Sequence, residues 1–355
     1  MMFTNEHGLS LRTLKYGEAI SEALVQSMKA DKSIFIMGIG VADPKGLFGT
    51  TVDAFKQFGA SRVVETPNSE NALTGIAIGA AATGKRPVIV HARNDFMFLA
   101  FDQMINLAAK WSYMYGGNAG SVPIVVRAII GKGWGQGATH SQSLQSVLGH
   151  FPGLQVVMPA TAADAKGLLV SAMQSSSPTV VLEHRSLFES QGVVPENLNP
   201  VPIGKAAIVK SGSDITIAAT SLMVRESLRA AEGLKSLGID AEVVDIRSIR
   251  PLDSATILGS VRKTGRLVVA DTSWVTYGVT AEIAALTVEQ AFDDLKAPVR
   301  RLGTADVPAP VSFPLEDAFY PNAENIAVAC LDLLNRNNEE LSVPSDVGPE
   351  FLGPY

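Results

Sequence analysis

The chain has 355 residues, of which 46% are hydrophobic and 18% are charged, enough for two ordinary domains with cores of their own. Its formal net charge of -6 offers no basic surface for nucleic acid, and no apolar run reaches the roughly 18–20 residues that a membrane helix needs. The N-terminus lacks the apolar core of a signal peptide, and a single cysteine, Cys330, excludes an internal disulfide and a multi-cysteine metal site. We therefore expect a soluble, cytoplasmic protein in which Cys330 is buried in a helix.

In the first half, short apolar runs alternate with helical patterns, which is typical of a parallel sheet covered by helices. The predicted strands are residues 33–38, 62–66, 86–91, 122–128, 154–159 and 179–184. The predicted helices are residues 14–30, 69–84, 100–116 and 161–175.

A polar, proline-containing stretch without a period follows, and the same rhythm then starts again. The second half has predicted strands at 214–220, 241–246, 266–271 and 299–303, and its clearest helix is 225–237, which ends at Gly238. The predicted fold is α/β, with two domains that each contain a mainly parallel sheet. We predict a first domain over 1–190, a linker over 191–204, a second domain over 205–335 and an extended tail over 336–355.

Two glycine-rich segments are candidate phosphate-binding loops. GIGVADPKG, from Gly38 to Gly46, lacks the third glycine of the dinucleotide pattern, and GKGWGQG, from Gly131 to Gly137, lacks the GK[ST] ending of a P-loop. Each is better explained as a tight turn than as an independent nucleotide site.

His140 differs from the other histidines because it follows a glycine-rich segment, in GATHSQS, where a loop can present its imidazole to a ligand. From the residues alone, a structural and a functional role both stay open for it. The remaining histidines are expected to be structural or solvent-facing: His7, His91, His150 and His184.

Glu70 stands at the start of an apolar, small-residue helix in the string VVETPNSENALTGIAIGAAATG. A glutamate in a first turn is favoured by the helix dipole alone. However, this helix has the composition of a buried one, and a buried carboxylate normally has a dedicated partner. We therefore favour a functional role for Glu70.

A series of segments in one order resembles a known family over nearly the whole chain. The segments include TPNSENALTGIAIGAAATGKRP, DFMFLAFDQMINLAAKWSYMYGG, GATHSQSL, HFPGLQVVMPATAADAKGLL and AEVVDIRSIRPLD. They resemble the beta subunits of the thiamine-diphosphate-dependent 2-oxo acid dehydrogenase family, which comprises pyruvate, branched-chain 2-oxo acid and acetoin dehydrogenases. The resemblance implies a pyrimidine-binding domain followed by a transketolase C-terminal-like domain.

The resemblance also implies roles for three residues. Glu70 matches the glutamate that hydrogen-bonds the pyrimidine N1′ of thiamine diphosphate, where a carboxyl group exchanges a proton and an amide cannot. Phe96 matches the aromatic residue that packs on the pyrimidine, and His140 matches the active-site histidine that assists the substrate or the acyl acceptor. The family decarboxylates a 2-oxo acid and passes the acyl unit to a lipoyl group.

A missing motif indicates a partner. Relatives hold the diphosphate through Mg²⁺ and a GDG…N motif, which in heteromeric enzymes belongs to the alpha subunit, and no GDG occurs in this chain. The resemblance therefore implies a site shared with an alpha subunit, in an α₂β₂ assembly, and a lipoyl acyltransferase as a further partner.

Some positions depart from the family pattern. Leu99 stands where pyruvate enzymes have a glutamine, and Tyr277 stands where they have a histidine. Ser175 replaces the acidic residue of the structural potassium site of some relatives, so we do not predict that ion. The tail is longer than usual, which leaves docking of an acyltransferase open.

Three alternatives stay open at this stage. The first is a two-chain transketolase-like enzyme that transfers a two-carbon unit to a sugar or a carrier protein. The second is a nicotinamide-dependent oxidoreductase that uses the Gly38 loop. The third is a non-catalytic scaffold, which the presence of Glu70, Phe96 and His140 together argues against.

Overall fold

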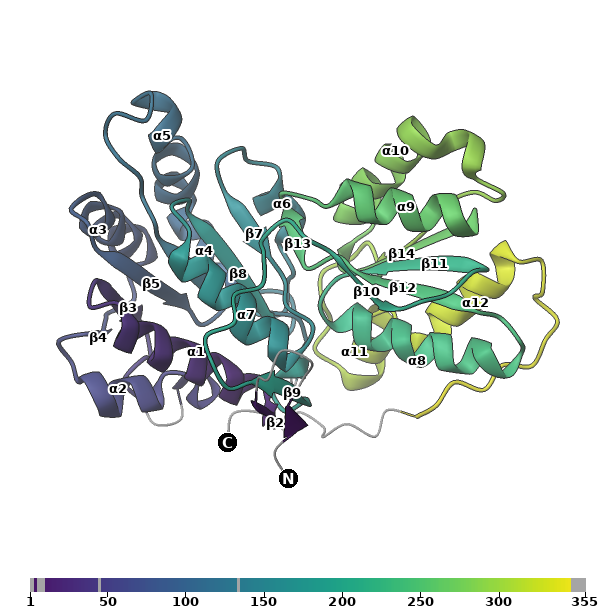
Figure 1. The fold of residues 1–355 in the computed structure, drawn as a ribbon, viewed down its shortest axis with the longest axis horizontal. Coiled ribbons are helices and arrows are strands. Elements are labelled where there is room, and N and C mark those ends of the chain that lie inside the picture. The colour runs from purple at the N-terminus through teal and green to yellow at the C-terminus, as the bar shows by residue number, and fades with distance from the viewer. Residues whose placement is uncertain (1–2, 5–9, 44–45, 133–134, 346–355) are drawn as a thin grey trace.

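A computed structural model of the chain describes residues 3–4, 10–43, 46–132 and 135–345. Two α/β units lie side by side, as Figure 1 shows, with the N-terminal half in purple to teal and the C-terminal half in green to yellow. This arrangement agrees with the predicted α/β fold of two mainly parallel domains.

The first unit is built on a seven-stranded sheet in the order β13-β7-β8-β6-β5-β3-β4. All of its neighbouring pairs are parallel except β13 with β7. Its strands are β3 (Ile34–Gly38), β4 (Val63–Glu65), β5 (Arg86–His91), β6 (Val125–Ile130), β7 (Gln155–Val157), β8 (Thr179–His184) and β13 (Ser248–Arg250). Every residue of β6 and β8 is buried, because helices cover both faces of the parallel sheet, and most of these residues are apolar.

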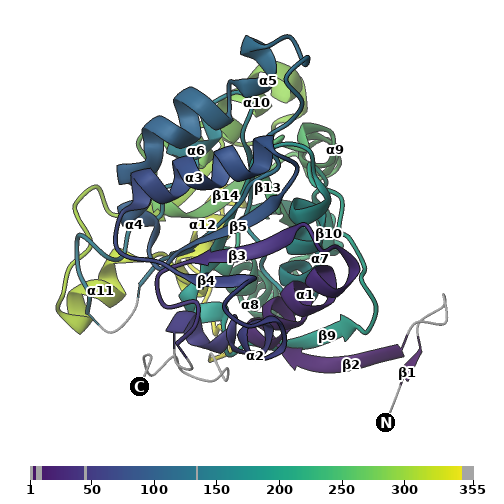
Figure 2. The ribbon, with the colours of Figure 1, turned by 90° about the vertical axis from the view of Figure 1, so that its left-hand side faces the viewer.

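Helices cover both faces of this sheet, and successive strand residues face opposite layers. Val88 and Val90 of β5 pack in the core on the side of α1 (Tyr16–Ala30) and α7 (Ala162–Gln174), whereas Ile89 between them packs on the side of α3 (Glu70–Ala82). Figure 2 shows α1 and α3 on opposite sides of β3 and β5. The alternation follows from the period of two of a β-strand.

The predicted helix 100–116 is not a single regular α-helix. It consists of a π-helical segment from Asp102 to Ala108 and a short α5 (Trp111–Met114), and the 3₁₀ turn Phe98–Ala100 precedes it. Ala109 donates its amide hydrogen to the carbonyl of Met104, five residues earlier, which is the wider π spacing.

The second unit is a five-stranded sheet in the order β10-β12-β11-β14-β15, parallel except for the edge strand β10. Its strands are β10 (Ala207–Lys210), β11 (Ile215–Ala219), β12 (Ala241–Asp245), β14 (Leu267–Trp274) and β15 (Arg300–Thr304). In Figure 1, one group of helices lies above this sheet and another below it. They are α9 (Ser254–Thr264) and α10 (Val279–Ala291) above, and α8 (Leu222–Ser236), α11 (Phe313–Phe319) and α12 (Ala323–Leu333) below.

The segment 191–204, for which the sequence predicts a linker, contains a strand. Strand β9 (Gln191–Pro195) pairs antiparallel with β2 (Ser10–Lys15) in a small sheet that also includes β1 (Phe3–Thr4). Strand β13, from the second half of the chain, completes the first sheet. Neither pairing has a local sequence signal, because each joins segments more than ninety residues apart.

One apolar core runs through both units. It includes Leu24 of α1, Leu168 of α7, Val243 of β12 and Leu234 of α8. Cys330 is fully buried in α12 in the same core, as the sequence predicts, and its burial raises the pKa of the thiol well above its ordinary value.

The described part of the tail, residues 336–345, contains no helix or strand and lies along α8. Arg229 of α8 donates from Nη2 to the carbonyl of Pro344 at 2.8 Å, and the backbone at Ser342 passes so close to Gly233 that a Cβ there would lie 2.9 Å from its oxygen. Among the described residues, no helix combines the length and hydropathy of a membrane-spanning segment.

A buried ion pair joins β6 to β8 inside the first unit. Arg127 donates from Nε and Nη2 to the two carboxylate oxygens of Glu183 at 2.6 and 2.8 Å, and Nη2 also donates to the hydroxyl of Thr50 at 3.1 Å. The two side chains are 2% and 1% exposed, so each charge depends on the other for compensation.

Glu183→Gln is expected to lower the free energy of unfolding by about 3–5 kcal/mol, because it leaves the Arg127 guanidinium buried without a counter-charge. Denaturant unfolding followed by circular dichroism measures this loss. The control is Asp332→Asn, which removes an exposed pair with Arg300 and should cost about 1 kcal/mol or less. If both variants lost the same free energy of unfolding, the buried ion pair would not have the stabilising role proposed for it.

Candidate active site

The candidate residues all follow strands at the carboxyl edge of the first sheet. Glu70 comes shortly after β4, Phe96 comes after β5, and His140 comes after β6. Because parallel strands all end at the same edge, their following loops meet there, and ligands of α/β sheets bind at this edge.

Phe96 and His140 lie against each other. Their ring centroids are 5.2 Å apart, and the ring planes meet at 70°, which is an edge-to-face arrangement. The Phe96 side chain is 40% exposed, which is unusual for a phenylalanine on the short buried helix α4 (Asn94–Met97). The pair therefore presents an aromatic face and an imidazole to whatever binds at this edge.

Glu70 occupies the first turn of α3. Its carbonyl accepts a hydrogen bond from the Thr74 hydroxyl at 2.8 Å, and its side chain is partly buried. Within the described residues, the Glu70 carboxylate makes no hydrogen bond and no ion pair. The structure therefore brings Phe96 and His140 into contact, whereas Glu70 lies at the start of α3 at the same edge of the sheet and does not contact that pair through a hydrogen bond or a ring contact.

Helix α3 is less buried than its composition predicts. Leu73, Ala77 and Ile78 face the core, whereas Ile76 is 60% exposed. The apolar side of α3 that points outward therefore has no cover in the single chain.

Two residues next to Phe96 hold the loop that carries His140. Asn94 donates from Nδ2 to the carbonyl of Gln142 and accepts at Oδ1 from the amide of Leu144, each at 3.0 Å. Asp95 accepts at Oδ1 from the amide of Gln142 at 3.2 Å and from its side chain at 2.9 Å. The sequence analysis missed both residues; the only available signal was two adjacent polar residues directly before an aromatic residue at a strand end.

The second unit also contacts the end of this loop. Gln145 donates from Nε2 to Oδ1 of Asp271 at 2.7 Å, and the Ser273 hydroxyl donates to the other oxygen of Asp271 at 2.6 Å. Asp271 is fully buried on β14. The loop therefore lies between the two units and depends on both.

Comparison with known proteins identifies the family. The model of the transketolase pyrimidine-binding domain matches residues 12–191, and that of the transketolase C-terminal domain matches residues 204–326. The beta subunit of acetoin:2,6-dichlorophenolindophenol oxidoreductase from Cupriavidus necator is 42% identical over 328 residues, which cover 90% of this chain and 96% of the relative. The pyruvate dehydrogenase E1 component subunit beta from Rickettsia felis is 40% identical over 88% of this chain and 95% of the relative.

This chain belongs to the family of pyruvate and acetoin dehydrogenase beta subunits. Membership makes it a component of an enzyme and confirms the resemblance that the sequence motifs carry. Among solved structures, a split-gene transketolase described as an inactive β4 tetramer shares the fold with a TM-score of 0.71 and 24% identity, over 92% of this chain and 99% of the other. A transketolase from Pichia stipitis matches with a TM-score of 0.65 and 15% identity, over 97% of this chain and 48% of the other.

The described part of the first glycine-rich loop is not built as a phosphate site; residues 44–45 of this loop lie outside the described residues. The amides of Gly40 and Ala42 donate to the two carboxylate oxygens of Glu65 at 2.6 and 2.9 Å, so a protein carboxylate already occupies the donors that a phosphate would need. Gly38 is required by packing, because a Cβ there would lie 2.5 Å from the carbonyl oxygen of Val90. Both facts support the prediction of a tight turn.

The second glycine-rich loop packs against the second unit. A Cβ on Gly137 would lie 2.6 Å from a methyl group of Val311, and one on Gly131 would lie 2.1 Å from Nε2 of His184. Residues 133–134 of this loop lie outside the described residues.

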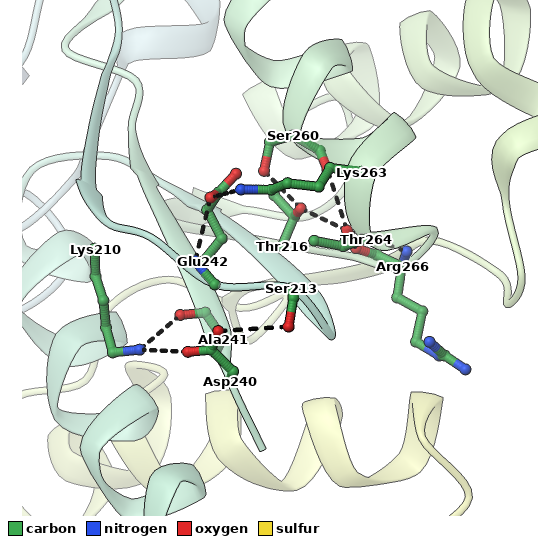
Figure 3. Close-up of polar contacts among 11 residues, drawn as sticks. Lys210, Ser213, Thr216, Asp240, Ala241, Glu242, Ser260, Lys263, Thr264 and Arg266 are labelled. Carbon is green, nitrogen blue, oxygen red and sulfur yellow. Dashed lines mark hydrogen bonds and ion pairs between the residues drawn. The ribbon is translucent and has the colours of Figure 1, made fainter. Parts of the chain in front are cut away.

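A buried polar network in the second unit has a structural role. At the amino ends of β11 and β12, Thr216 hydrogen-bonds Ser260 at 2.7 Å and Thr264 at 2.8 Å, and Lys263 pairs with the buried Glu242 (Figure 3). This network fixes α9 to the sheet at the edge opposite to the one that α/β sheets use for ligands.

Ser175, the position that departs from the potassium-binding relatives, directly follows α7 as its C-cap residue. Arg86 donates from Nη1 to the carbonyls of Met173 and Ser175 at 3.0 and 2.8 Å, and a guanidinium thus caps the helix C-terminus. Across the described ranges, no group of three or more histidine, cysteine, aspartate or glutamate side chains has the arrangement of a metal site.

The other departures lie on the surface: Leu99 is 60% exposed, and Tyr277 is 94% exposed.

His91 and His184, at the ends of β5 and β8, are buried as the sequence analysis expects for structural histidines. Burial lowers the pKa of His91 to about 4 and is the main cause that lowers the pKa of His184 to about 3. His150 is exposed beside Phe151 rather than packed in the core, and His7 lies outside the described residues.

The free energy of unfolding is expected to fall as the pH drops from about 6.5 to about 4. Over this window the unfolded chain binds a proton at His91, whereas the folded chain keeps the buried imidazole neutral because its pKa is about 4. The difference between the ordinary histidine pKa of 6.5 and the pKa of about 4 in the folded chain corresponds to about 3 kcal/mol of unfolding free energy, which is lost when His91 is protonated in the unfolded chain. Urea unfolding at several pH values should give a flatter pH dependence for His91→Gln than for the wild type, and His150→Gln should not differ. Parallel curves for the wild type and His91→Gln would contradict the buried neutral state.

Proposed function

We propose that this chain is the beta subunit of a heteromeric thiamine-diphosphate-dependent 2-oxo acid dehydrogenase. In this proposal the enzyme decarboxylates a 2-oxo acid and passes the acyl unit to a lipoyl acceptor. The observation that carries the proposal is the placement of Glu70, Phe96 and His140 after β4, β5 and β6, at the carboxyl edge of the parallel sheet of a pyrimidine-binding domain. The named relatives are pyruvate and acetoin enzymes, which favours this reading over the two-chain transketolase alternative.

The residues at the sheet edge fit the aminopyrimidine half of thiamine diphosphate. Phe96 offers an exposed aromatic face, and the Glu70 carboxylate has no polar partner among the described residues. A partly buried carboxylate without a partner is costly, and a ring nitrogen that shares a proton with it would remove that cost. When it is bound, the cofactor supplies the electron sink for decarboxylation.

Each of the three residues then has one task. The Glu70 carboxyl group holds and exchanges a proton at the pyrimidine N1′, which sets the tautomer of the ring. Phe96 orients the ring by packing on its face. His140 moves a proton at the oxygen of the substrate or at the acyl acceptor, as a general acid or base.

The site needs a second chain to be complete. The sequence has no GDG motif, so we propose that an alpha subunit binds the diphosphate with Mg²⁺ and that the assembly is α₂β₂. Two hollows of about 750 and 660 Å³ lie between the units, one at α8 and one at α10, and neither is lined by Phe96 or His140. An open edge of this kind agrees with a site that a partner closes.

Exposed apolar side chains occur on β4, on α3 and in the 3₁₀ turn Phe98–Ala100, and α3 packs against that turn. Ile76 and Leu99 are each 60% exposed, Phe98 is 42% exposed and Val64 is 37% exposed. Apolar side chains grouped in this way mark a surface that binds another protein, and we assign it to the alpha subunit. Binding of a lipoyl acyltransferase and a cytoplasmic location stay predictions.

Glu70→Gln is expected to lower kcat of the reconstituted enzyme by about 10²–10⁴, because an amide cannot exchange the proton that general acid–base catalysis requires. Decarboxylation of pyruvate or another 2-oxo acid with an artificial electron acceptor measures this loss. The matched control is Glu324→Gln, which removes another first-turn glutamate, at the start of α12, and should leave kcat unchanged. Unchanged turnover in Glu70→Gln would refute the catalytic role.

Thiamine diphosphate with Mg²⁺ is expected to bind only when the alpha subunit is present, because the chain alone lacks the diphosphate site. Calorimetric titration of the chain, with and without its partner, tests this expectation. In the complex, Phe96→Ala should weaken binding by about threefold to tenfold through the loss of the aromatic contact, whereas Phe292→Ala, at an exposed phenylalanine that follows α10, should not. Tight metal-dependent binding by the chain alone would contradict the shared site.

A further inference from the structure

Three consecutive carbonyl groups at His140 each accept a hydrogen bond from a different element. Arg185 donates from Nη2 to the carbonyl of His140 at 2.8 Å, Tyr320 donates from its hydroxyl to that of Ser141 at 3.0 Å, and Asn94 donates to that of Gln142. In a surface loop, backbone carbonyl groups normally accept hydrogen bonds from water. Here three protein donors hold them, so the backbone at His140 is fixed more firmly than that of an ordinary loop.

Arg185 holds the segment at two points. Besides the His140 carbonyl, its Nη1 donates to Oε1 of Gln136 at 2.7 Å, and Arg93 donates from Nε to the same oxygen at 3.1 Å. The Arg185 side chain is fully buried directly after β8. A buried guanidinium with fixed acceptors is a rigid support, because its planar group cannot rotate without losing both bonds.

Tyr320 brings the second unit into this support. It follows α11, and its ring is 6% exposed and lies 5.7 Å from the Lys132 ammonium group. Lys132 pairs with Asp317 at 3.1 Å. Together with the contact of Gly137 against Val311, these interactions place residues 309–320 against the segment that carries His140.

The imidazole itself is left available. Its edge-to-face contact with Phe96 and the 2.9 Å approach of the Thr139 hydroxyl to Nδ1 set its orientation. No described residue hydrogen-bonds Nε2, which is therefore the nitrogen that can reach a ligand.

We propose that Arg185 and Tyr320 are positioning residues for His140, so that the second unit takes part in the reaction through the backbone of the first. The proposal rests on the proposed function, because it assigns the two residues to the placement of a catalytic imidazole. A displacement of about 1 Å in a reacting group can cost about 10² in rate, which gives the support a catalytic purpose beyond stability.

The test uses Tyr320→Phe, which deletes one hydroxyl group, and Arg185→Lys, which keeps the charge but loses the two-point contact. Tyr16→Phe and Arg86→Lys are the matched controls, because the Tyr16 hydroxyl and the Arg86 guanidinium also donate to backbone carbonyls, those of Pro159 and of Met173 and Ser175. Each control makes the same substitution as its test variant, but at a site that does not contact the carbonyl groups near His140.

Two measurements are made on these variants. In the complex with the alpha subunit, Tyr320→Phe should lower kcat by about threefold to tenfold, which corresponds to the loss of one hydrogen bond, with KM changed by less than about twofold. On the full chain, acylation of His140 by diethyl pyrocarbonate at pH 7, followed by peptide mass spectrometry, should rise at least about twofold relative to the exposed His150 as the ring loses its fixed position. Arg185→Lys should change both quantities in the same direction, and the two controls should change neither.

The outcomes separate this inference from the proposed function. An unchanged acylation ratio and unchanged kcat in Tyr320→Phe would overturn the positioning role while an active wild-type complex leaves the proposed function intact. Conversely, Tyr320→Phe could raise the acylation of His140 relative to His150 while the wild-type complex shows no decarboxylase activity. That result would support the positioning of His140 and refute the proposed function. Because Tyr320→Phe removes a single oxygen atom, the test does not depend on whether Arg185→Lys folds.

Discussion

The parallel pairing of β3, β4, β5 and β6 is the constraint on which the rest of the site depends. It directs the ends of these strands to one edge of the sheet and so brings Glu70, Phe96 and His140, which lie 26 and 44 positions apart in the chain, to that edge. The strands can pair in this way only because both faces are covered and every residue of β6 is apolar or paired. The Arg127–Glu183 ion pair is a buried, charged exception inside this layer, and it links β6 to the neighbouring β8.

The two units behave as one body in this structure. A shared apolar core, the β13 pairing and the contacts of Gln145 with Asp271 and of Tyr320 with Ser141 all cross between them. Both of these hydrogen bonds lie on the segment that follows β6. The second unit, which contributes none of the three proposed site residues, therefore still determines where the His140 backbone lies.

Helix α3 leaves apolar side chains exposed to solvent in the single chain. Its inward side packs on the sheet, but Ile76 and the neighbouring Leu99 remain open to solvent in the single chain. Exposed apolar area of this kind costs free energy unless a partner covers it. The composition of α3, which predicts a buried helix, thus reflects the burial of the proposed complex rather than that of the isolated chain.

The sequence by itself determined the α/β class, nearly all strands of both large sheets and the family, and it predicted Glu70, Phe96 and His140 as candidate site residues. These depend on local apolar runs and on motifs that are continuous in the chain, such as TPNSENALTG and GATHSQS. Only the tertiary structure decided the pairing of β9 with β2, the transfer of β13 into the first sheet, and the support of His140 by Asn94, Arg185 and Tyr320. The hydrogen bonds that support the His140 segment join residues that are 45 to 179 positions apart in the chain. A hydrogen bond between such distant segments produces no periodic pattern or fixed spacing in the sequence.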